Sequence, residues 1–540
     1  MGHLTTVSKP LLLFYICVIL VGISARWVRM AQRTVLFHDE AVSYLSATGH
    51  QGEFALVFKN QAYPLNNWVP AEEWKRFIQA EKWFAFNQIA SDLARFDLHP
   101  PLYFWVLHLW TLIFGTNILT GLLLNVSIDL VILFVLMRFA LIYLQNLSEA
   151  LLVACAWILS PVSVATSDWI RHYVLFTLFF LLFAYLLYKF IYLPEQVKIM
   201  SGSGLWLAAI TTGGLLTHYN FVLAILIGII IVGIKCLRGN AMRLVTLVIW
   251  LSMGGFLFLL IYPDSYLQLL RYGQGSQGSP GDWGELNYRL RRTISTGTLL
   301  FSPFFLILAV VAWNFLLTHK ISNPKEVRAK FFACIKKYKE QPLNLYILGW
   351  TILTTGIVIL LYLASISPQH AMASRYVSFI SPYVALISIL TARLFQLNSR
   401  HHVLFCTLML ILGIGTAWGP SLRDSDDNNA NQVELTGWNL VVVDNLYKPF
   451  ILSVANYLPG QTEVFVAGQN YLIDHNRDWL PRLSKEGGGY IATSSQGATA
   501  KQREDILSLI SQDNKGVSQL GTVWKQNEIG VNVKIYQVGP

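Results

Sequence analysis

The first 420 residues consist of long apolar segments separated by shorter polar ones. A helix that crosses a membrane needs about 20 consecutive, predominantly apolar residues. Segments that meet this requirement cover residues 10–27, 119–142, 148–166, 172–191, 203–218, 219–237, 242–263, 295–317, 343–364, 377–397 and 403–420. The pattern therefore predicts a polytopic α-helical membrane domain over residues 1–420, with about 11 transmembrane helices.

One apolar segment, residues 99–115, does not fit a membrane span. It is short, it opens with Pro100 and Pro101, and it carries His108 in its middle. We therefore expect an aromatic-rich helix that lies in the plane of the membrane interface. The segment then belongs to a large first outer loop, residues 28–118, and long ordered loops are usually functional.

The pattern changes after residue 420. A polar linker, Asp424–Asn431, is followed by strand-like runs at Glu463–Ala467 and Val531–Val538 and by a helical pattern at Gln502–Ile510. These elements predict a small soluble α/β domain over residues 421–540, outside the membrane.

Composition supports the membrane assignment. Hydrophobic residues make up 54% of the 540-residue chain and charged residues only 13%, whereas soluble globular domains carry about 25% charged residues. The formal net charge of +10 arises in residues 1–420, because residues 421–540 hold 10 Lys+Arg against 13 Asp+Glu. No basic patch interleaved with aromatic residues indicates nucleic-acid binding, so we expect no nucleic-acid partner.

The distribution of basic residues predicts the topology. The loop 319–342 holds seven Lys/Arg against two Glu, so the positive-inside rule places it in the cytoplasm. Counting spans from this loop puts the N-terminus in the cytoplasm and the C-terminal domain outside, provided that residues 99–115 do not cross. The expected location is the cell (plasma or inner) membrane, with multiple passes.

Candidate chemistry gathers in short polar clusters that this topology places on the outer side: Phe37–Ala41, Phe96–Tyr103, Ser167–Tyr173, Thr217–Asn220 and Ser374–Tyr376. Each also has a purely structural explanation, such as a solvated acidic pair, a Pro-initiated interfacial helix or a structural ion pair. Taken together they suggest an outer cavity, because arginines neutralise phosphate and a carboxylate activates a hydroxyl. Apolar helices around it can hold a lipid tail, as a transferase with a lipid-phosphate-linked donor requires.

The order of these motifs resembles that of GT-C glycosyltransferases. It runs Asp39-Glu40, then His99-Pro-Pro with its aromatic helix, Asp168-x-x-Arg171-x-Tyr173, Thr217-His218-Tyr219 and Arg375-Tyr376 before Pro382. The resemblance covers roughly residues 10–420. It is to the dolichyl-phosphate-mannose–protein mannosyltransferase-like group, whose bacterial members include the lipid A aminoarabinose transferase. Such enzymes transfer a sugar, with inversion, from a polyprenyl-phosphate donor on the non-cytoplasmic side, here to a lipid, glycan or protein acceptor.

The resemblance implies a role for particular residues. Asp39 would be the catalytic base with Glu40 as its neighbour, and Asp168 would be the second acidic site. The donor phosphate would be held by Arg171, Tyr173, Arg375 and Tyr376, and the cavity would be lined by Asp97, His99 and His218. No cofactor is required with certainty. A divalent metal stays open, with Asp39, Glu40 and Asp168 as its candidate ligands, although a lone Asp168 in place of an acidic pair argues against tight metal binding.

Two other readings stay open. A transporter or flippase of a lipid-linked sugar would use the same cavity without chemistry, although such proteins usually show internal repeats, which this sequence lacks. An assembly scaffold would depend on the outer C-terminal domain instead. The Gly-rich segment Gly273–Gly281 follows no strand and opens no helix, so we expect a flexible outer loop that moves over the cavity when donor binds.

Overall fold

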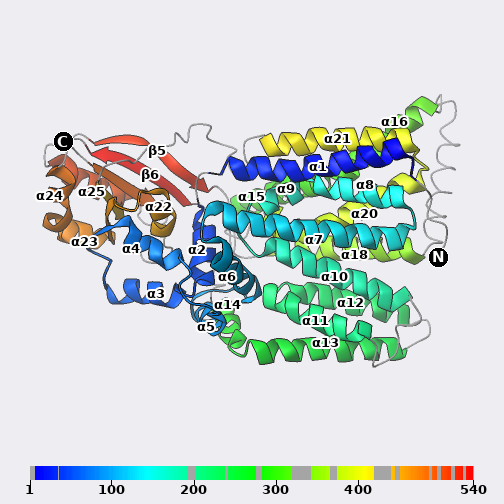
Figure 1. The fold of residues 1–540 in the computed structure, drawn as a ribbon, viewed down its shortest axis with the longest axis horizontal. Coiled ribbons are helices and arrows are strands. Elements are labelled where there is room, and N and C mark those ends of the chain that lie inside the picture. Colours follow the sequence, from blue (N-terminus) through cyan, green and yellow to red (C-terminus); the bar gives the residue numbers. More distant parts are fainter. Residues whose placement is uncertain are drawn as a thin grey trace. The chain divides into compact units, whose positions relative to one another are not determined.

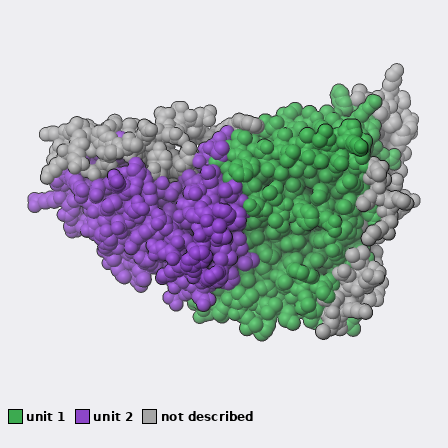
Figure 2. Space-filling view, viewed as in Figure 1, with its two compact units in different colours: residues 1–30, 125–419 green, residues 31–124, 420–540 purple. Residues whose placement is uncertain are grey.

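A computed structural model describes residues 7–33, 36–192, 202–236, 241–274, 283–318, 342–364, 374–418, 439–443, 450–485, 489–494, 500–512, 517–526 and 531–538. Three predicted segments lie outside the described residues. They are residues 319–341 of the basic loop 319–342, the linker Asp424–Asn431, and residues 275–281 of the Gly-rich segment. The chain forms two compact units, coloured separately in Figure 2. Unit 1 contains residues 1–30 and 125–419, and unit 2 contains residues 31–124 and 420–540.

Unit 1 is a bundle of apolar helices lying side by side (Figure 1). Its elements are α1 (Lys9–Ala31), α7 (Ile118–Leu144), α8 (Leu147–Ile158), α9 (Pro161–Ser167), α10 (Tyr173–Tyr192), α11 (Gly202–Thr217), α12 (Phe221–Cys236), α13 (Ala241–Ile261), α14 (Ser265–Gln274), α15 (Trp283–Leu300), α16 (Ser302–Thr318), α18 (Pro342–Ala364), α19 (Ser374–Val377), η4 (Ser378–Ile380), α20 (Ser381–Leu394) and α21 (Ser399–Trp418). Each predicted span coincides with one or two of these helices.

The described helices confirm a polytopic membrane protein. Seven of them are long and apolar enough to cross a membrane, and up to nine spans result if each of two bent helix pairs counts as one. The remaining two predicted spans correspond to α11 and α12, which have 16 residues each. These two helices are shorter than the roughly 20 residues of a typical span.

The bend between α8 and α9 has a local cause. The two helices meet at 58°, where Pro161 occupies the first turn of α9 and Ser160 caps it by accepting the Ser163 N–H through its hydroxyl at 3.2 Å. Proline has no N–H to continue the preceding helix, and a serine N-cap replaces the missing backbone partner. The sequence thus breaks one apolar segment into two helices.

Unit 2 contains a mixed six-stranded sheet in the order β1-β3-β2-β4-β6-β5. The strands are β1 (Trp68–Pro70), β2 (Asn439–Val443), β3 (Glu463–Ala467), β4 (Gly489–Ser494), β5 (Val517–Gln526) and β6 (Val531–Val538). Strands β2, β3 and β4 are parallel, and β6 is antiparallel to both β4 and β5. The predicted strands Glu463–Ala467 and Val531–Val538 match β3 and β6 residue for residue.

Helices complete unit 2. The segment between α1 and α7 contributes α2 (His38–Ala47), α3 (Gln51–Asn60), α4 (Ala71–Lys75), η1 (Arg76–Ile78), α5 (Phe86–Phe96) and α6 (Leu102–Phe114). From the C-terminal part come α22 (Ile451–Tyr457), α23 (Gln469–Asp474), α24 (Asn476–Lys485) and α25 (Ala500–Gln512). The small α/β domain predicted after residue 421 is therefore present, and α25 contains the predicted helix at Gln502–Ile510.

The compact units differ from the predicted domains in one respect. We predicted the loop 28–118 as part of the membrane domain, whereas residues 31–124 group with the C-terminal region. The reason is the strand β1, which pairs antiparallel with β3, with Trp68 opposite Phe465. Their rings are 5.4 Å apart, so the first loop and the chain after residue 420 share a sheet.

The segment predicted to lie in the interface forms α6, which has 13 residues. A helix of this length is about 20 Å long, short of the roughly 30 Å of a hydrocarbon core. His108 in its middle is fully buried. Its Nδ1 donates to the Ala47 carbonyl at 2.8 Å and its Nε2 accepts the Ala85 N–H at 3.2 Å. The histidine that looked anomalous in an apolar segment therefore ties three parts of unit 2 together.

Candidate functional site

The turn between α9 and α10 carries three of the predicted site residues, namely Asp168, Arg171 and Tyr173. The turn is tight, because the Arg171 N–H donates to the Trp169 carbonyl at 2.7 Å, and that carbonyl also accepts from the Asn125 side-chain amide. The side chains of the turn are all buried. A turn whose backbone is fixed from two directions presents its side chains in a defined orientation.

Asp168 forms an ion pair with Arg29 of α1, and Nη2 of Arg29 lies 3.0 Å from Oδ2 of Asp168. Both side chains are at most 5% exposed. Arg29 also donates through Nη1 to the Thr416 carbonyl of α21 at 2.7 Å. A buried carboxylate costs several kcal/mol unless a partner compensates its charge, so the arginine of the first helix stabilises the ionised form of Asp168.

A second buried ion pair lies one turn earlier on α1. Nε of Arg26 is 2.8 Å from Oδ2 of Asp129 on α7. The same guanidinium donates to the Ser163 hydroxyl at 2.6 Å and to the Ile158 carbonyl at 2.7 Å. Arg26 thereby satisfies a carbonyl released by the bend between α8 and α9 and a hydroxyl on the other side of it.

Close packing of α1 on α8 makes this contact possible. A Cβ atom added to Gly22 would lie 2.8 Å from the Ile158 side chain, which is too close for a real contact. The absence of a side chain at Gly22 lets the two helices approach closely. Arg26, four residues further along α1, then reaches the Ile158 carbonyl.

Arg375 lies between two aromatic rings. Its Cζ is 4.2 Å from the centroid of the Trp169 ring and 4.9 Å from that of Tyr376, and its Nη2 donates to the Tyr376 hydroxyl at 3.1 Å. The side chain is 1% exposed. Cation–π contacts of this kind strengthen when water is excluded. The sequence clusters Ser167–Tyr173 and Ser374–Tyr376, which are about 200 residues apart, are thus in contact.

Aromatic and histidine rings continue from this point. The Tyr173 and Tyr376 rings are 5.6 Å apart in an edge-to-face arrangement, and the His172 ring lies 4.4 Å from Tyr173 and 4.8 Å from His218. The His218 Nδ1 accepts the Asn220 N–H at 3.0 Å. The structure therefore brings together four predicted residues and two of their sequence neighbours, from the turn after α9, from α10, from the turn after α11 and from α19. We call this set, Trp169, His172, Tyr173, His218, Arg375 and Tyr376, the arginine–aromatic cluster.

The acidic pair Asp39-Glu40 belongs to unit 2 and starts α2. Glu40 is fully buried: its Oε2 accepts the Phe37 N–H at 2.9 Å and lies 2.5 Å from Nη2 of Arg33. The Arg33 guanidinium also covers the Phe37 ring at 4.2 Å. A carboxylate that accepts the N-cap N–H of its own helix and pairs with an arginine stabilises the start of that helix.

Asp39 differs from its neighbour because it is half-buried rather than buried. Its backbone carbonyl accepts the Ser43 hydroxyl at 2.9 Å within α2. Consecutive helical residues point about 100° apart, so the two carboxylates of the pair do not share one environment. Of the two, Asp39 remains our candidate for a base.

Asp97 and His99 form a local turn before α6. The Asp97 Oδ1 accepts the N–H groups of Leu98 and His99 and lies 2.5 Å from the His99 Nδ1. An aspartate that binds the two following amides is a common way to begin a helix after a turn. Nothing in the geometry of unit 2 by itself assigns these two side chains to a cavity.

Among the described residues, no group of three or more His, Cys, Asp or Glu side chains is placed to hold a metal ion. Two of the three candidate ligands are bound to arginines, Glu40 to Arg33 and Asp168 to Arg29. A guanidinium beside a carboxylate repels a divalent cation from it. Glu40 and Asp168 in these ion pairs therefore do not fit a divalent metal.

Several residues of these contacts were not among our predicted site residues, namely Arg26, Arg29, Arg33, Asp129 and Trp169. The sequence does carry a signal for two of them. Arg26 and Asp129 lie within apolar helices, and ionisable residues inside membrane spans are rare and mark functional or structural pairs. That these two residues pair with each other could not be predicted from the sequence near either one, because 103 residues separate them.

Comparisons with known proteins give a likeness in structure alone. No family model and no curated protein matches the chain. Similar solved structures include ArnT from Cupriavidus metallidurans bound to undecaprenyl phosphate, with 12% identity, 98% of each chain covered and a TM-score of 0.49. The apo state of the same protein gives 13% identity, 97% of each chain covered and a TM-score of 0.49.

The Archaeoglobus fulgidus oligosaccharyltransferase in complex with Zn and sulfate is also similar. It shows 10% identity, covers 91% of this chain and 69% of its own, and gives a TM-score of 0.45. ArnT and this oligosaccharyltransferase are GT-C glycosyltransferases, the group that the motif order resembles. At such identities and at TM-scores below 0.5, the likeness assigns no function to this chain. The evidence for a function has to come from its own side chains.

Proposed function

We propose that the chain is a membrane glycosyltransferase. It moves a sugar from a polyprenyl-phosphate-linked donor to an acceptor hydroxyl on the non-cytoplasmic side, with inversion at the anomeric carbon. The acceptor is a lipid, a glycan or a protein. The observation that carries the proposal is the buried guanidinium of Arg375 between Trp169 and Tyr376 in a bundle of apolar helices.

A buried cation in an apolar bundle suits a phosphate that is attached to a lipid. Charged residues inside membrane domains are expensive and usually mark functional pathways. Aromatic faces and a phenol hydroxyl contact the Arg375 guanidinium. The planar guanidinium is well suited to phosphate because it offers several donors in a fixed fork. Arg171, two residues after Trp169, supplies a second cation in the same turn.

The proposed reaction is a single displacement. The acceptor oxygen forms a bond to the anomeric carbon while the bond from that carbon to the phosphate oxygen breaks. The electron pair of the broken bond leaves with the polyprenyl phosphate, and Arg375 and Arg171 stabilise its added negative charge. The acceptor proton passes to a carboxylate, for which Asp39 is our candidate.

The first test separates transfer from transport by its product. The purified protein in lipid nanodiscs is incubated with a polyprenyl-phosphate-linked sugar and a mixture of acceptor lipids and glycans, and the lipids are analysed by mass spectrometry. A transferase releases free polyprenyl phosphate, and Arg375→Ala abolishes the release. Recovery of only intact lipid-linked sugar from the nanodiscs, together with movement of that lipid across the membrane of sealed vesicles in a separate assay, would instead identify a flippase.

A second test addresses the phosphate site without knowledge of the sugar. Binding of undecaprenyl phosphate is measured by native mass spectrometry for the wild type, Arg375→Ala and Arg400→Ala. A charge-assisted hydrogen bond contributes about 1.5–3 kcal/mol, so Arg375→Ala should weaken binding at least tenfold. Arg400, exposed at the start of α21, is the matched control. Equal weakening by both variants would show only a general charge effect.

A further inference from the structure

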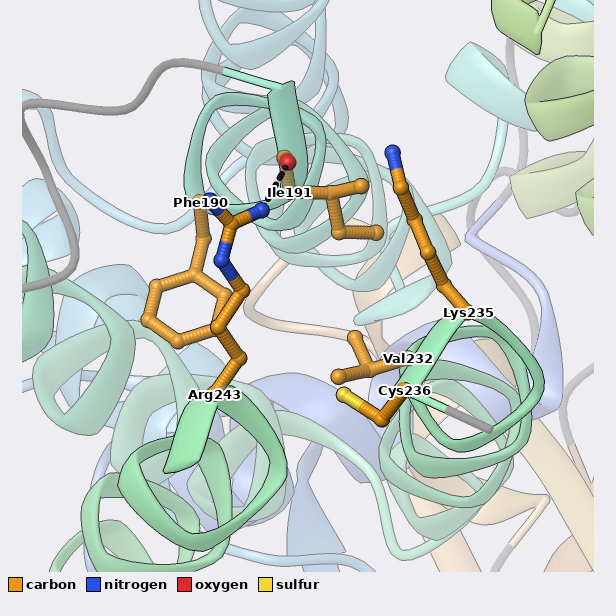
Figure 3. A pocket seen from close by; sticks show the side chains of 6 residues that line it. All are labelled: Phe190, Ile191, Val232, Lys235, Cys236 and Arg243. Carbon is orange, nitrogen blue, oxygen red and sulfur yellow. Dashed lines mark hydrogen bonds between the residues drawn. The ribbon is translucent and has the colours of Figure 1, made fainter. Parts of the chain in front are cut away.

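We propose a second lipid site, distinct from the arginine–aromatic cluster and independent of the transferase assignment. It lies where α10 and α12 end and α13 begins, and the ligand is the anionic headgroup of a phospholipid. A small pocket is present there (Figure 3), lined by Phe190, Ile191, Val232, Lys235, Cys236 and Arg243. We call it the basic pocket.

Two cations from different helices stand on its rim. Figure 3 shows the Arg243 guanidinium and the Lys235 ammonium group on either side of Ile191. Nη1 of Arg243 donates to the Ile191 carbonyl at 2.8 Å, which orients the guanidinium. Nζ of Lys235 is 3.6 Å from the centroid of the Tyr192 ring. Both contacts fix the position of a positive charge without neutralising it, since neither partner is a carboxylate.

The remaining walls are apolar. Phe190, Ile191 and Val232 are buried, whereas Lys235 is exposed and Arg243 is half-buried. Apolar side chains beside two basic ones match a phospholipid, whose acyl chains adjoin a charged phosphate. Large hydrophobic side chains are exposed at the same ends of the neighbouring helices, namely Leu205 and Trp206 of α11, Ile234 of α12 and Met242 and Val245 of α13.

Charge complementarity selects an anionic headgroup. The residues that line this pocket include two basic side chains, Lys235 and Arg243, and no carboxylate. The sequence predicts that this end faces the cytoplasm, where anionic lipids attract basic residues. Basic pockets between transmembrane helices bind such headgroups, and each basic residue near the surface contributes about a fivefold gain in affinity. Nη1 of Arg243 donates to the Ile191 carbonyl. The other N–H groups of the Arg243 guanidinium are therefore the ones that suit a phosphate oxygen.

The experiment uses the full-length protein in nanodiscs that contain equal amounts of phosphatidylglycerol and phosphatidylcholine with identical acyl chains. Lipids retained after release from the nanodisc are counted by native mass spectrometry. We expect the wild type to retain phosphatidylglycerol preferentially. The double variant Lys235→Gln/Arg243→Gln should lose this preference by more than tenfold. Arg243→Lys, which keeps the charge, should retain most of it and shows that the loss does not come from unfolding.

Lys189→Gln is the matched control. Lys189 lies on α10 at the same end of the bundle, with its Nζ 4.4 Å from the centroid of the Tyr185 ring, but it does not line the pocket. An unchanged preference in Lys189→Gln supports the site, and an equal loss would overturn it in favour of a general surface charge. Retention of phosphatidylglycerol by the double variant would also overturn it. Displacement of the lipid by millimolar inorganic phosphate would show that the pocket binds free phosphate rather than a lipid.

Discussion

The guanidinium carbon of Arg375 lies 4.2 Å from the centroid of the Trp169 ring. The two residues are far apart in the sequence and belong to α19 and to the turn after α9. Trp169 is itself 2% exposed and its carbonyl is bound by the turn. The tryptophan therefore acts as a fixed surface against which the arginine is oriented, and it connects the turn that carries Asp168 with Arg375.

The first prediction concerns this contact. Trp169→Leu removes the aromatic face but leaves an apolar side chain, so we expect phosphate-lipid affinity to fall about five- to thirtyfold, as a desolvated cation–π contact of about 1–2 kcal/mol implies. Arg375→Lys should also lose affinity, because an ammonium group cannot form the same fork. Binding of undecaprenyl phosphate measures both. Unchanged affinity in Trp169→Leu would show that the ring does not orient Arg375.

The second prediction concerns the ion pair between Arg29 and Asp168. Replacing one partner leaves a buried charge without compensation, which costs about 3–5 kcal/mol. Arg29→Met and Asp168→Asn should therefore each lower the melting temperature of the purified protein strongly. The double variant should recover much of the loss. Thermal unfolding in detergent measures the cycle, and simple additivity of the two losses would argue against a direct pair.

The third prediction separates the two carboxylates of the acidic pair. Asp39→Asn should abolish sugar transfer while phosphate-lipid binding and thermal stability stay close to those of the wild type, because the base acts only in the chemical step. Glu40→Gln should lower stability by about 3 kcal/mol, since Arg33 would lose its buried partner. Full transfer activity in Asp39→Asn would remove it as the base.

The fourth prediction is a pH dependence in unit 2. Burial lowers the pKa of His108 below its ordinary value, although its backbone hydrogen bonds act in the opposite direction. A histidine whose folded-state pKa is lowered binds fewer protons in the folded than in the unfolded state. The stability of its surroundings therefore falls as the pH drops below about 6.5.

Hydrogen–deuterium exchange of peptides around Ala85 measures this effect. The Ala85 N–H is bound to the His108 ring nitrogen that protonation would occupy. After correction for the intrinsic slowing of amide exchange at lower pH, its exchange should therefore show an additional acceleration between about pH 6.5 and 5.5. In His108→Gln, which does not titrate, the additional acceleration should disappear. Identical pH profiles in both proteins would contradict the assignment.

Local sequence predicted most of the secondary structure. The span at 172–191 coincides with α10 to within one residue, and β3 and β6 have the predicted bounds. These elements depend on their own hydropathy and on β-branched composition, both of which are local properties. The bend within 148–166 was not predicted, although Ser160 and Pro161 carry a recognisable helix-start pattern.

The site was predicted only in part. The residue types of the arginine–aromatic cluster were apparent from short motifs, because arginine, tyrosine and histidine are unusual at the boundaries of apolar segments. The arginine partners of Glu40 and Asp168 were harder to predict, since Arg33 precedes Glu40 by 7 residues and Arg29 precedes Asp168 by 139. Whether a carboxylate is a base, a ligand or half of an ion pair depends on its neighbours in space.

The sequence by itself determined that the chain is a multi-pass membrane protein with a small α/β region, because the bilayer and the pleated strand each select for patterns of hydrophobicity that are readable over 5 to 20 residues. Only the tertiary structure decided which charges compensate one another, that Trp169 holds Arg375, and that β1 of the first loop joins the C-terminal sheet. These outcomes depend on the packing of helices and the pairing of strands far apart in sequence, where a shift of a few ångströms changes the partner of a charge and hence its chemistry.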